Sequence, residues 1–228
     1  MEDDLPLYKD MTRLIFIRHG QSLANEQDKF AGQTDVPLTE LGKKQARCAA
    51  EYIVKREKID KIYSSDLQRA HDTALPVSEL TGLPINDVKG LRELCAGVWE
   101  GMFVSDIAVK YEKEFNTWRN DFSNAHLPGG ESVQEVYERV VPFVKQLARE
   151  NDGLTLLLTS HATPIRAVLC NAQGWGWQKM CDVPFISNSV ISIFEYDEKT
   201  DTLHVIERGI KEHLNPSIIS YIPKGLRN

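Results

Sequence analysis

The chain has 228 residues, of which 42% are hydrophobic and 26% are charged, a composition that is ordinary for a globular protein. Its 27 Lys and Arg residues against 33 Asp and Glu residues give a formal net charge of −6 at pH 7. This balance disfavours nucleic acid or an anionic membrane as a partner, because either would require a basic face. A small anionic substrate remains compatible with it, since a pocket needs only a few local cations.

The cysteines and the N-terminus indicate the compartment. Four cysteines are scattered along the chain with neither a CxxC pair nor the spacing of a zinc site: Cys48, Cys95, Cys170 and Cys181. We therefore expect reduced thiols. The acidic start of the chain lacks the apolar segment of a signal peptide, and the longest aliphatic run, residues 154–158, is too short to span a membrane. The predicted localisation is cytoplasmic.

The first 90 residues predict strands and helices in alternation. Residues 14–17 (LIFI) form a short apolar run, which is typical of a strand buried on both faces. Thr39 then opens a helix, whose apolar residues share one face: Ala46, Ala49, Ala50 and Ile53. Two further strands are predicted at residues 62–63 and 85–88. They flank a helix over residues 69–80 that Gly82-Leu83-Pro84 ends.

The middle of the chain, residues 91–130, predicts a single helix with Ser105 as its N-cap and loops around it. The apolar face of that helix holds Val104, Ile107, Ala108, Tyr111, Phe115 and Trp118. The segment ends in Pro128-Gly129-Gly130. We interpret residues 91–130 as a cap inserted over one end of a sheet.

The remaining residues return to alternating helices and strands. Residues 132–135 (SVQE) form a capping box that starts a long helix, which Pro142 is expected to kink. Residues 154–159 are the clearest buried strand, and Thr163-Pro164 starts a helix with proline at its first position. Two last strands are expected near residues 190–196 and 203–207.

This order of elements predicts an α/β fold, a three-layer α/β/α sandwich with a mostly parallel central sheet. No linker divides the chain, so we predict one catalytic domain over residues 1–228. Within it, residues 1–11 form a short N-terminal extension and residues 91–130 form the cap over the carboxyl ends of the strands.

Cationic side chains follow three of the predicted strands. Arg18 and His19 come after the first strand, Arg69 comes shortly after the second, and His161 comes after residue 159 and directly before a helix. Ligands of open α/β sheets bind outside the carboxyl ends of the strands, and a helix N-terminus attracts anions. The spacing therefore predicts a phosphate site.

The same segments resemble the histidine phosphatase superfamily, the phosphoglycerate-mutase-like proteins. The similarity runs in order through LIFIRHGQSLAN (14–25), GQTDVPLT (32–39), YSSDLQRA (63–70), LRE (91–93) with GVWEG (97–101), PGGES (128–132) and LTSHATPIR (158–166). Each fragment alone is weak, but the ordered set is specific. The resemblance implies the phosphoglycerate-mutase-like fold.

The resemblance also implies roles for individual residues. His19 is the nucleophile that forms a phosphohistidine, and Glu93 is the proton donor. Arg18, Arg69 and His161 complete the catalytic set by stabilising charge on the phosphoryl oxygens. The expected phosphate-binding residues are Arg18, His19, Asn25, Gln33, Arg69, Glu93, His161 and Ala162. No cofactor and no metal is expected, because two arginines and two histidines take the place of a cation.

Two departures from the family pattern and one glycine are informative. Gln21 stands where Glu is frequent, which should affect the rim of the pocket more than the reaction. Ala162 stands where Gly is usual, so the backbone there is less free to approach substrate. Gly20 suits a turn that brings backbone close to the phosphate.

Three functions share these motifs: a phosphomonoesterase, a mutase and an inactive binding scaffold. The complete catalytic set disfavours the scaffold. A mutase would carry extra basic groups in its insertion, whereas residues 94–130 contain only Lys110, Lys113, Arg119 and His126. We therefore predict a phosphatase acting on a small phosphorylated metabolite, with mutase activity as the alternative.

The sequence leaves the substrate and the assembly open. Sugar phosphates, phosphoglycerate and α-ribazole phosphate all stay compatible, and the oligomeric state, a dimer included, is undetermined. Four aromatic residues are candidates for an apolar pocket wall: Phe30, Trp99, Trp118 and Phe122. Trp118 fits an ordinary core position equally well. Trp175 and Trp177 fit either the rim of the pocket or a subunit contact.

Overall fold

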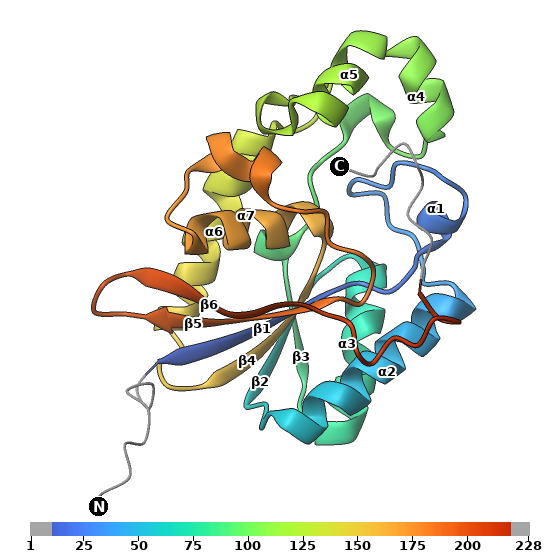
Figure 1. The fold of residues 1–228 in the computed structure, drawn as a ribbon. Coiled ribbons are helices and arrows are strands. Elements are labelled where there is room, and N and C mark those ends of the chain that lie inside the picture. Colours follow the sequence, from blue (N-terminus) through green and yellow to red (C-terminus); the bar gives the residue numbers. More distant parts are fainter. Residues whose placement is uncertain (1–10, 220–228) are drawn as a thin grey trace, which may run out of the picture.

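The computed structural model describes residues 11–219, whose strands form one six-stranded sheet with helices on both faces (Figure 1). The strand order is β3-β2-β4-β1-β5-β6. Strands β3, β2, β4 and β1 run parallel, whereas β5 and β6 form an antiparallel hairpin at one edge. The predicted fold class is confirmed. The strands are β1 (Thr12–Arg18), β2 (Lys61–Ser65), β3 (Ile85–Val88), β4 (Thr155–Ser160), β5 (Ile191–Asp197) and β6 (Thr202–Ile210).

Helices cover the sheet in two layers. Helices α2 (Glu40–Arg56) and α3 (Gln68–Thr81) pack on one face, and α6 (Val133–Arg149) and α7 (Ala162–Ala172) pack on the other (Figure 1). Successive side chains of a strand point to opposite faces. Leu14 and Phe16 of β1 therefore join the α6/α7 side, while Ile15 and Ile17 join the α2/α3 side. Both faces of β1 are buried, which is why its sequence is continuously apolar.

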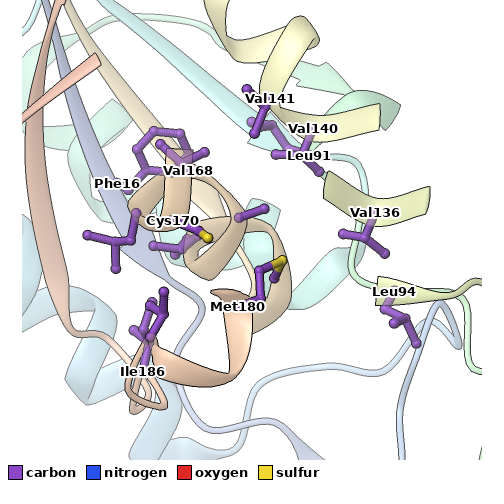
Figure 2. Packing of buried hydrophobic residues seen from close by; sticks show 14 of the residues in the cluster. Phe16, Leu91, Leu94, Val136, Val140, Val141, Val168, Cys170, Met180 and Ile186 are labelled. Carbon is purple, nitrogen blue, oxygen red and sulfur yellow. The ribbon is translucent and has the colours of Figure 1, made fainter. Parts of the chain in front are cut away.

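The larger of the two hydrophobic clusters lies between the sheet, α6 and α7. Figure 2 shows part of this cluster, which includes Val136 and Val140 of α6, Val168 of α7 and Phe16 of β1. The Phe16 and Phe194 rings meet edge to face with centroids 5.6 Å apart. This layer forms a rigid base beneath the carboxyl ends of β1 and β4.

Two predicted helix starts are confirmed by their caps. The Thr39 hydroxyl accepts a hydrogen bond from the Gly42 amide at the start of α2. Ser132 and Glu135 form the reciprocal capping box of α6. Helix α6 continues through Pro142 to Arg149, with the proline on its exposed side.

Two details of the predicted cap helix are wrong. The cap holds two helices, α4 (Val104–Lys110) and α5 (Glu112–Asn120), because the backbone leaves the helical region at Tyr111. This bend lets the rings of Tyr111 and Phe115 both pack against Trp99. The N-cap of α4 is Phe103 and not Ser105. The carbonyl of Asp28 accepts from the Val104 amide, so a capping side chain is unnecessary there.

Helix α7 begins at Ala162, two residues before Pro164. Pro164 is therefore its third residue and not its first. Amides of the first helical turn have no carbonyl partner within the helix, so the missing N–H costs nothing at this position. The consequence for the site is that the first turn of α7 begins directly after His161.

The cap lies beyond the carboxyl ends of the parallel strands (Figure 1). It consists of α4, α5 and short 3₁₀ turns at Gly97–Trp99 and Phe122–Asn124. Other short elements are α1 (Leu23–Glu26) and 3₁₀ turns at Lys89–Leu91 and Trp177–Asp182. The expected N-terminal extension, residues 1–11, lies outside the described residues except for Met11. Across residues 11–219, no helix is both long and apolar enough to cross a bilayer.

Candidate active site

The predicted cationic residues meet because β2, β4 and β1 are neighbours in the sheet. Arg18 at the end of β1 lies opposite Ser160 at the end of β4. The amide of His19 then donates to the Ser160 carbonyl at 2.9 Å, so the two chains leave the sheet together. The His19 and His161 rings consequently lie close, with centroids 5.1 Å apart.

His19 is held as a neutral ring with a defined tautomer. Its Nδ1 lies 2.7 Å from the Gly20 carbonyl oxygen, which can only accept, so Nδ1 carries the proton. Burial lowers the pKa of His19 well below its ordinary value, and the charges of Arg69 and Arg18 lower it further. The ring therefore retains an unprotonated Nε2 at neutral pH.

Two buried guanidinium groups flank His19. Arg69 donates to the carbonyls of Thr34 and Gly32 at 2.9 and 2.7 Å, and Arg18 donates to the carbonyl of Ile186. The Nε atom of each arginine is buried and has no partner within the described residues. Burial lowers the pKa of each to about 10, with Glu93 acting in the opposite direction, so both stay charged at neutral pH. Both residues line the cavity, where a guanidinium suits an anion's oxygens.

His161 is completely buried and does not line the cavity. Its Nε2 lies 2.8 Å from the Ser65 hydroxyl, and its Nδ1 has no partner among the described residues. Burial lowers the pKa of His161 well below its ordinary value, and the charges of Arg69 and Arg18 add to that effect. The structure thus places a second neutral ring beside His19 at the N-terminus of α7.

Glu93 reaches the same place from the loop before the cap. Its Oε1 accepts from the Leu94 amide at 2.9 Å and from the Thr163 amide, in the first turn of α7, at 3.3 Å. The carbonyl of Glu93 accepts from Gln33 Nε2 at 3.1 Å and from Arg139 at 3.4 Å. The carboxylate is therefore oriented by backbone amides while two side chains hold its backbone.

Arg139 of α6 fastens the loop that carries Glu93. Its guanidinium donates to the carbonyls of Gly90 and Arg92 at 3.2 Å each, and it forms an ion pair with Glu131 at 2.9 Å. The Glu131 carboxylate in turn accepts from the Cys95 amide on the other side of Glu93. The sequence offered no signal for this arrangement, because Arg139 lies 46 residues from Glu93.

One cavity, about 740 Å³ with its open mouth included, collects these residues. Six of the eight predicted phosphate-binding residues line it: Arg18, His19, Asn25, Arg69, Glu93 and Ala162. The other two, Gln33 and His161, do not. The prediction that Gln33 binds phosphate finds no support here, because its side chain lies against the backbone of Glu93.

Aromatic side chains form much of the wall. Phe30, Trp118 and Phe122 line the cavity as predicted, with Trp118 packed edge to face against both phenylalanines. Trp99 does not, because it is fully buried behind them as the centre of the cap's core. Phe185, which sequence reasoning missed, also lines the cavity. The Arg18 guanidinium lies over its ring, 4.9 Å from the ring centre.

Sequence reasoning also missed two cations in the cavity wall, Lys29 and Arg166. Arg166 ends the motif quoted above and lies four residues after Ala162, on the same face of α7, and that spacing was the available signal. Lys29 had none, because its position depends on how the loop after α1 packs against the cap. Over residues 11–219, no cation that lines the cavity forms an ion pair.

Two residues noted in the sequence, Gln21 and Gly20, have structural explanations. Gln21 lies outside the cavity, and its Oε1 accepts from the Thr39 hydroxyl at 2.8 Å. Gly20 is required by packing, because a Cβ there would lie 2.4 Å from the Gly42 carbonyl oxygen of α2. The expectation that Gly20 serves a tight turn beside the phosphate stays a prediction.

Other candidate residues lie away from the cavity. The four basic residues of segment 94–130 are exposed and none lines it: Lys110, Lys113, Arg119 and His126. Trp175 and Trp177 also lie outside it, with the Trp175 carbonyl accepting from the Tyr137 hydroxyl. Across the described residues, no group of three or more His, Cys, Asp or Glu side chains is arranged to hold a metal ion.

Comparisons with known proteins agree with this geometry. A family model described as "Histidine phosphatase superfamily (branch 1)" matches residues 14–208. The chain is 32% identical over 208 residues to phosphoserine phosphatase 1 of Hydrogenobacter thermophilus, covering 90% of this chain and 95% of that one. It is 29% identical to a metal-independent phosphoserine phosphatase of Arabidopsis thaliana, covering 73% and 71%. The solved structure of mycobacterial glucosyl-3-phosphoglycerate phosphatase superimposes with a TM-score of 0.79 at 28% identity, covering 87% and 99%.

Proposed function

The chain belongs to branch 1 of the histidine phosphatase superfamily, and we propose that it is a metal-independent phosphomonoesterase that works through a phosphohistidine on His19. That it is a phosphatase rests on the family and on relatives so named. The finer proposal rests on one observation: the Nδ1 proton of His19 is bonded to the Gly20 carbonyl, which leaves Nε2 as a neutral nucleophile. The relatives named above act, by their names, on small phosphorylated compounds.

In the first step, His19 Nε2 attacks the phosphorus and the bond from phosphorus to the leaving oxygen breaks. Glu93 gives its proton to that oxygen, so the product leaves as an alcohol. The ring gains positive charge as the P–N bond forms, and the Gly20 carbonyl stabilises it through Nδ1–H. Arg18 and Arg69 donate to the phosphoryl oxygens, where charge develops.

In the second step, water attacks the phosphohistidine. Glu93, now a carboxylate, takes a proton from that water while the oxygen of the water bonds to phosphorus. The P–N bond breaks, phosphate leaves, and His19 returns to its neutral form. No step needs a metal ion, because the cationic side chains supply the charge that a metal would otherwise provide.

The test is hydrolysis of p-nitrophenyl phosphate with excess EDTA. We expect undiminished activity in the wild type and a loss of at least about 10³-fold in His19→Ala. A phosphoryl group trapped on the wild type should be stable in alkali and labile in acid, and it should be absent from His19→Ala. Inactivation by EDTA, or an active His19→Ala enzyme, contradicts the mechanism.

Glu93→Gln tests the proton donor. It should slow alkyl phosphates more than p-nitrophenyl phosphate, because only the poor leaving group needs protonation. Equal slowing of both substrates contradicts the role. An assay for interconversion of 3-phosphoglycerate and 2-phosphoglycerate addresses the mutase alternative. Since no basic residue of segment 94–130 lines the cavity, we expect hydrolysis to dominate.

A further inference from the structure

The cavity holds more positive charge than the proposed reaction uses. Four cationic side chains line it, Arg18, Arg69, Lys29 and Arg166, and Glu93 is the one acidic side chain among the lining residues. In the proposed first step Glu93 carries a proton, so with neutral histidines the lining holds four positive charges and no negative one. A phosphomonoester dianion neutralises two of these charges and leaves two unmatched. Charge kept in a partly apolar cavity without a partner is costly unless a ligand supplies one.

Arg166 is a prepared binding group. Its guanidinium lies 3.9 Å from the centre of the Phe122 ring, and its Nη2 donates to the Met180 carbonyl at 2.9 Å. The residue is only 3% exposed, yet its Nε has no partner within residues 11–219. These contacts fix the plane of the guanidinium at the cavity wall. A planar guanidinium held this way suits a carboxylate, which it can bind through two parallel hydrogen bonds.

Arg166 stands apart from the phosphate-binding arginines. Arg18 follows β1 and Arg69 opens α3, and both their charges lower the pKa of His19 and of His161. Arg166 comes from the second turn of α7 and packs against Phe122 of the cap. It therefore enters the cavity between α7 and the cap.

Lys29 supplies a second cation on the cap side. Its backbone bridges to Phe103, and its Nζ lies 4.8 Å from the centre of the Phe103 ring. Lys29 is partly exposed, so its flexible ammonium can approach a bound anion from the mouth. Phe30 and Trp118 line the same cavity, and their apolar rings strengthen the attraction between charges there.

We propose that Arg166, assisted by Lys29, forms a second anion site that binds a carboxylate of the substrate. The preferred substrates are then small phosphomonoesters that carry a carboxylate, whose additional negative charge pairs with Arg166. This inference rests on the proposed function and adds the substrate class to it. It assigns specificity to α7 and the loop after α1, and not to the basic residues of the cap.

The experiment compares O-phosphoserine with phosphoethanolamine, which lacks only the carboxylate. We expect the wild type to favour phosphoserine in kcat/KM by about 10- to 100-fold, the range for a charge-assisted pair. Arg166→Met should bring that ratio near one, Arg166→Lys should retain part of it, and Lys29→Met should lower it by a smaller factor. Arg119→Met, an exposed arginine of α5 outside the cavity, is the matched control and should keep the wild-type ratio.

The outcomes separate this inference from the proposed function. A wild-type ratio near one, with p-nitrophenyl phosphate still hydrolysed through His19, overturns the carboxylate site alone. So does an unchanged ratio in folded Arg166→Met. If Arg166→Met does not fold, the ratio measured for the wild type and for Lys29→Met still tests the carboxylate site. Preference for a bisphosphate over the matching carboxylated monophosphate would show a second phosphoryl site instead and also overturn the proposal. Absence of any His19-dependent hydrolysis would refute the proposed function itself.

Discussion

Acid should destabilise this protein steeply below about pH 6.5, because two histidine rings are buried without charge. His19 and His161 are 3% and 0% exposed, and burial, followed by the charges of nearby arginines, lowers the pKa of both. In the unfolded chain each ring returns to a pKa of about 6.5. Below that pH the unfolded state binds more protons than the native state, so the free energy of unfolding falls as pH falls.

The magnitude follows from linkage. If a ring stays neutral in the native state, protonation of that ring in the unfolded chain lowers the free energy of unfolding. The decrease is about 1.4 kcal/mol at pH 5.5 and almost nothing at pH 8. The two rings together then remove at most about 2.8 kcal/mol over that interval. Carboxylates contribute little there, because they titrate mainly below about pH 5. His213, whose pKa is lowered by burial as well, acts in the same direction.

Urea unfolding followed by circular dichroism at pH 8 and pH 5.5 measures this loss. His161→Asn removes one of the two rings, so its loss between the two pH values should be smaller by about 1.4 kcal/mol. His213 is present in both proteins, and its effect cancels in the comparison. A wild-type loss below about 1 kcal/mol, or the same loss in His161→Asn, would refute the argument that the rings are neutral.

Two further substitutions test the packing around the site. Gly20→Ala would place a Cβ 2.4 Å from the Gly42 carbonyl oxygen, so we expect a loss of about 1–3 kcal/mol in thermal or urea unfolding, and a wild-type midpoint would contradict it. Arg139→Met would release the loop that carries Glu93, so kcat should fall by about 10- to 100-fold for alkyl phosphates, with a smaller change for p-nitrophenyl phosphate and in KM. Arg139→Lys should restore part of that kcat, and an equal loss for both substrate types would indicate a merely structural role.

Local signals explain which elements the sequence predicted. Residues 14–17 read as a buried strand because both faces of β1 are covered, and Thr39 and Ser132 read as helix starts because their caps involve residues three positions away. The cap helices were less predictable. The bend at Tyr111 depends on packing against Trp99, and the start of α4 depends on the carbonyl of Asp28.

The predicted site also contains residues that local sequence places and residues that only distant contacts place. The positions of Arg18, His19 and His161 follow from covalent adjacency to β1 and β4, which their own apolar residues identify. The position of Gln33 does not, because its partner is the backbone of Glu93, 60 residues away. The family motif predicts that Gln33 binds phosphate, whereas in the structure its side chain donates to the backbone of the loop that carries Glu93.

The sequence by itself determined the sheet, the family and the order in which basic residues leave the strands, since each of these depends on contiguous residues. The tertiary structure alone decided which nitrogen of His19 carries the proton, which arginines lack partners, and that Arg166 and Lys29 share a cavity with Glu93. These properties depend on burial and on partners far apart in the chain. The net charge of −6 therefore gave no indication of a cavity that four cationic side chains line.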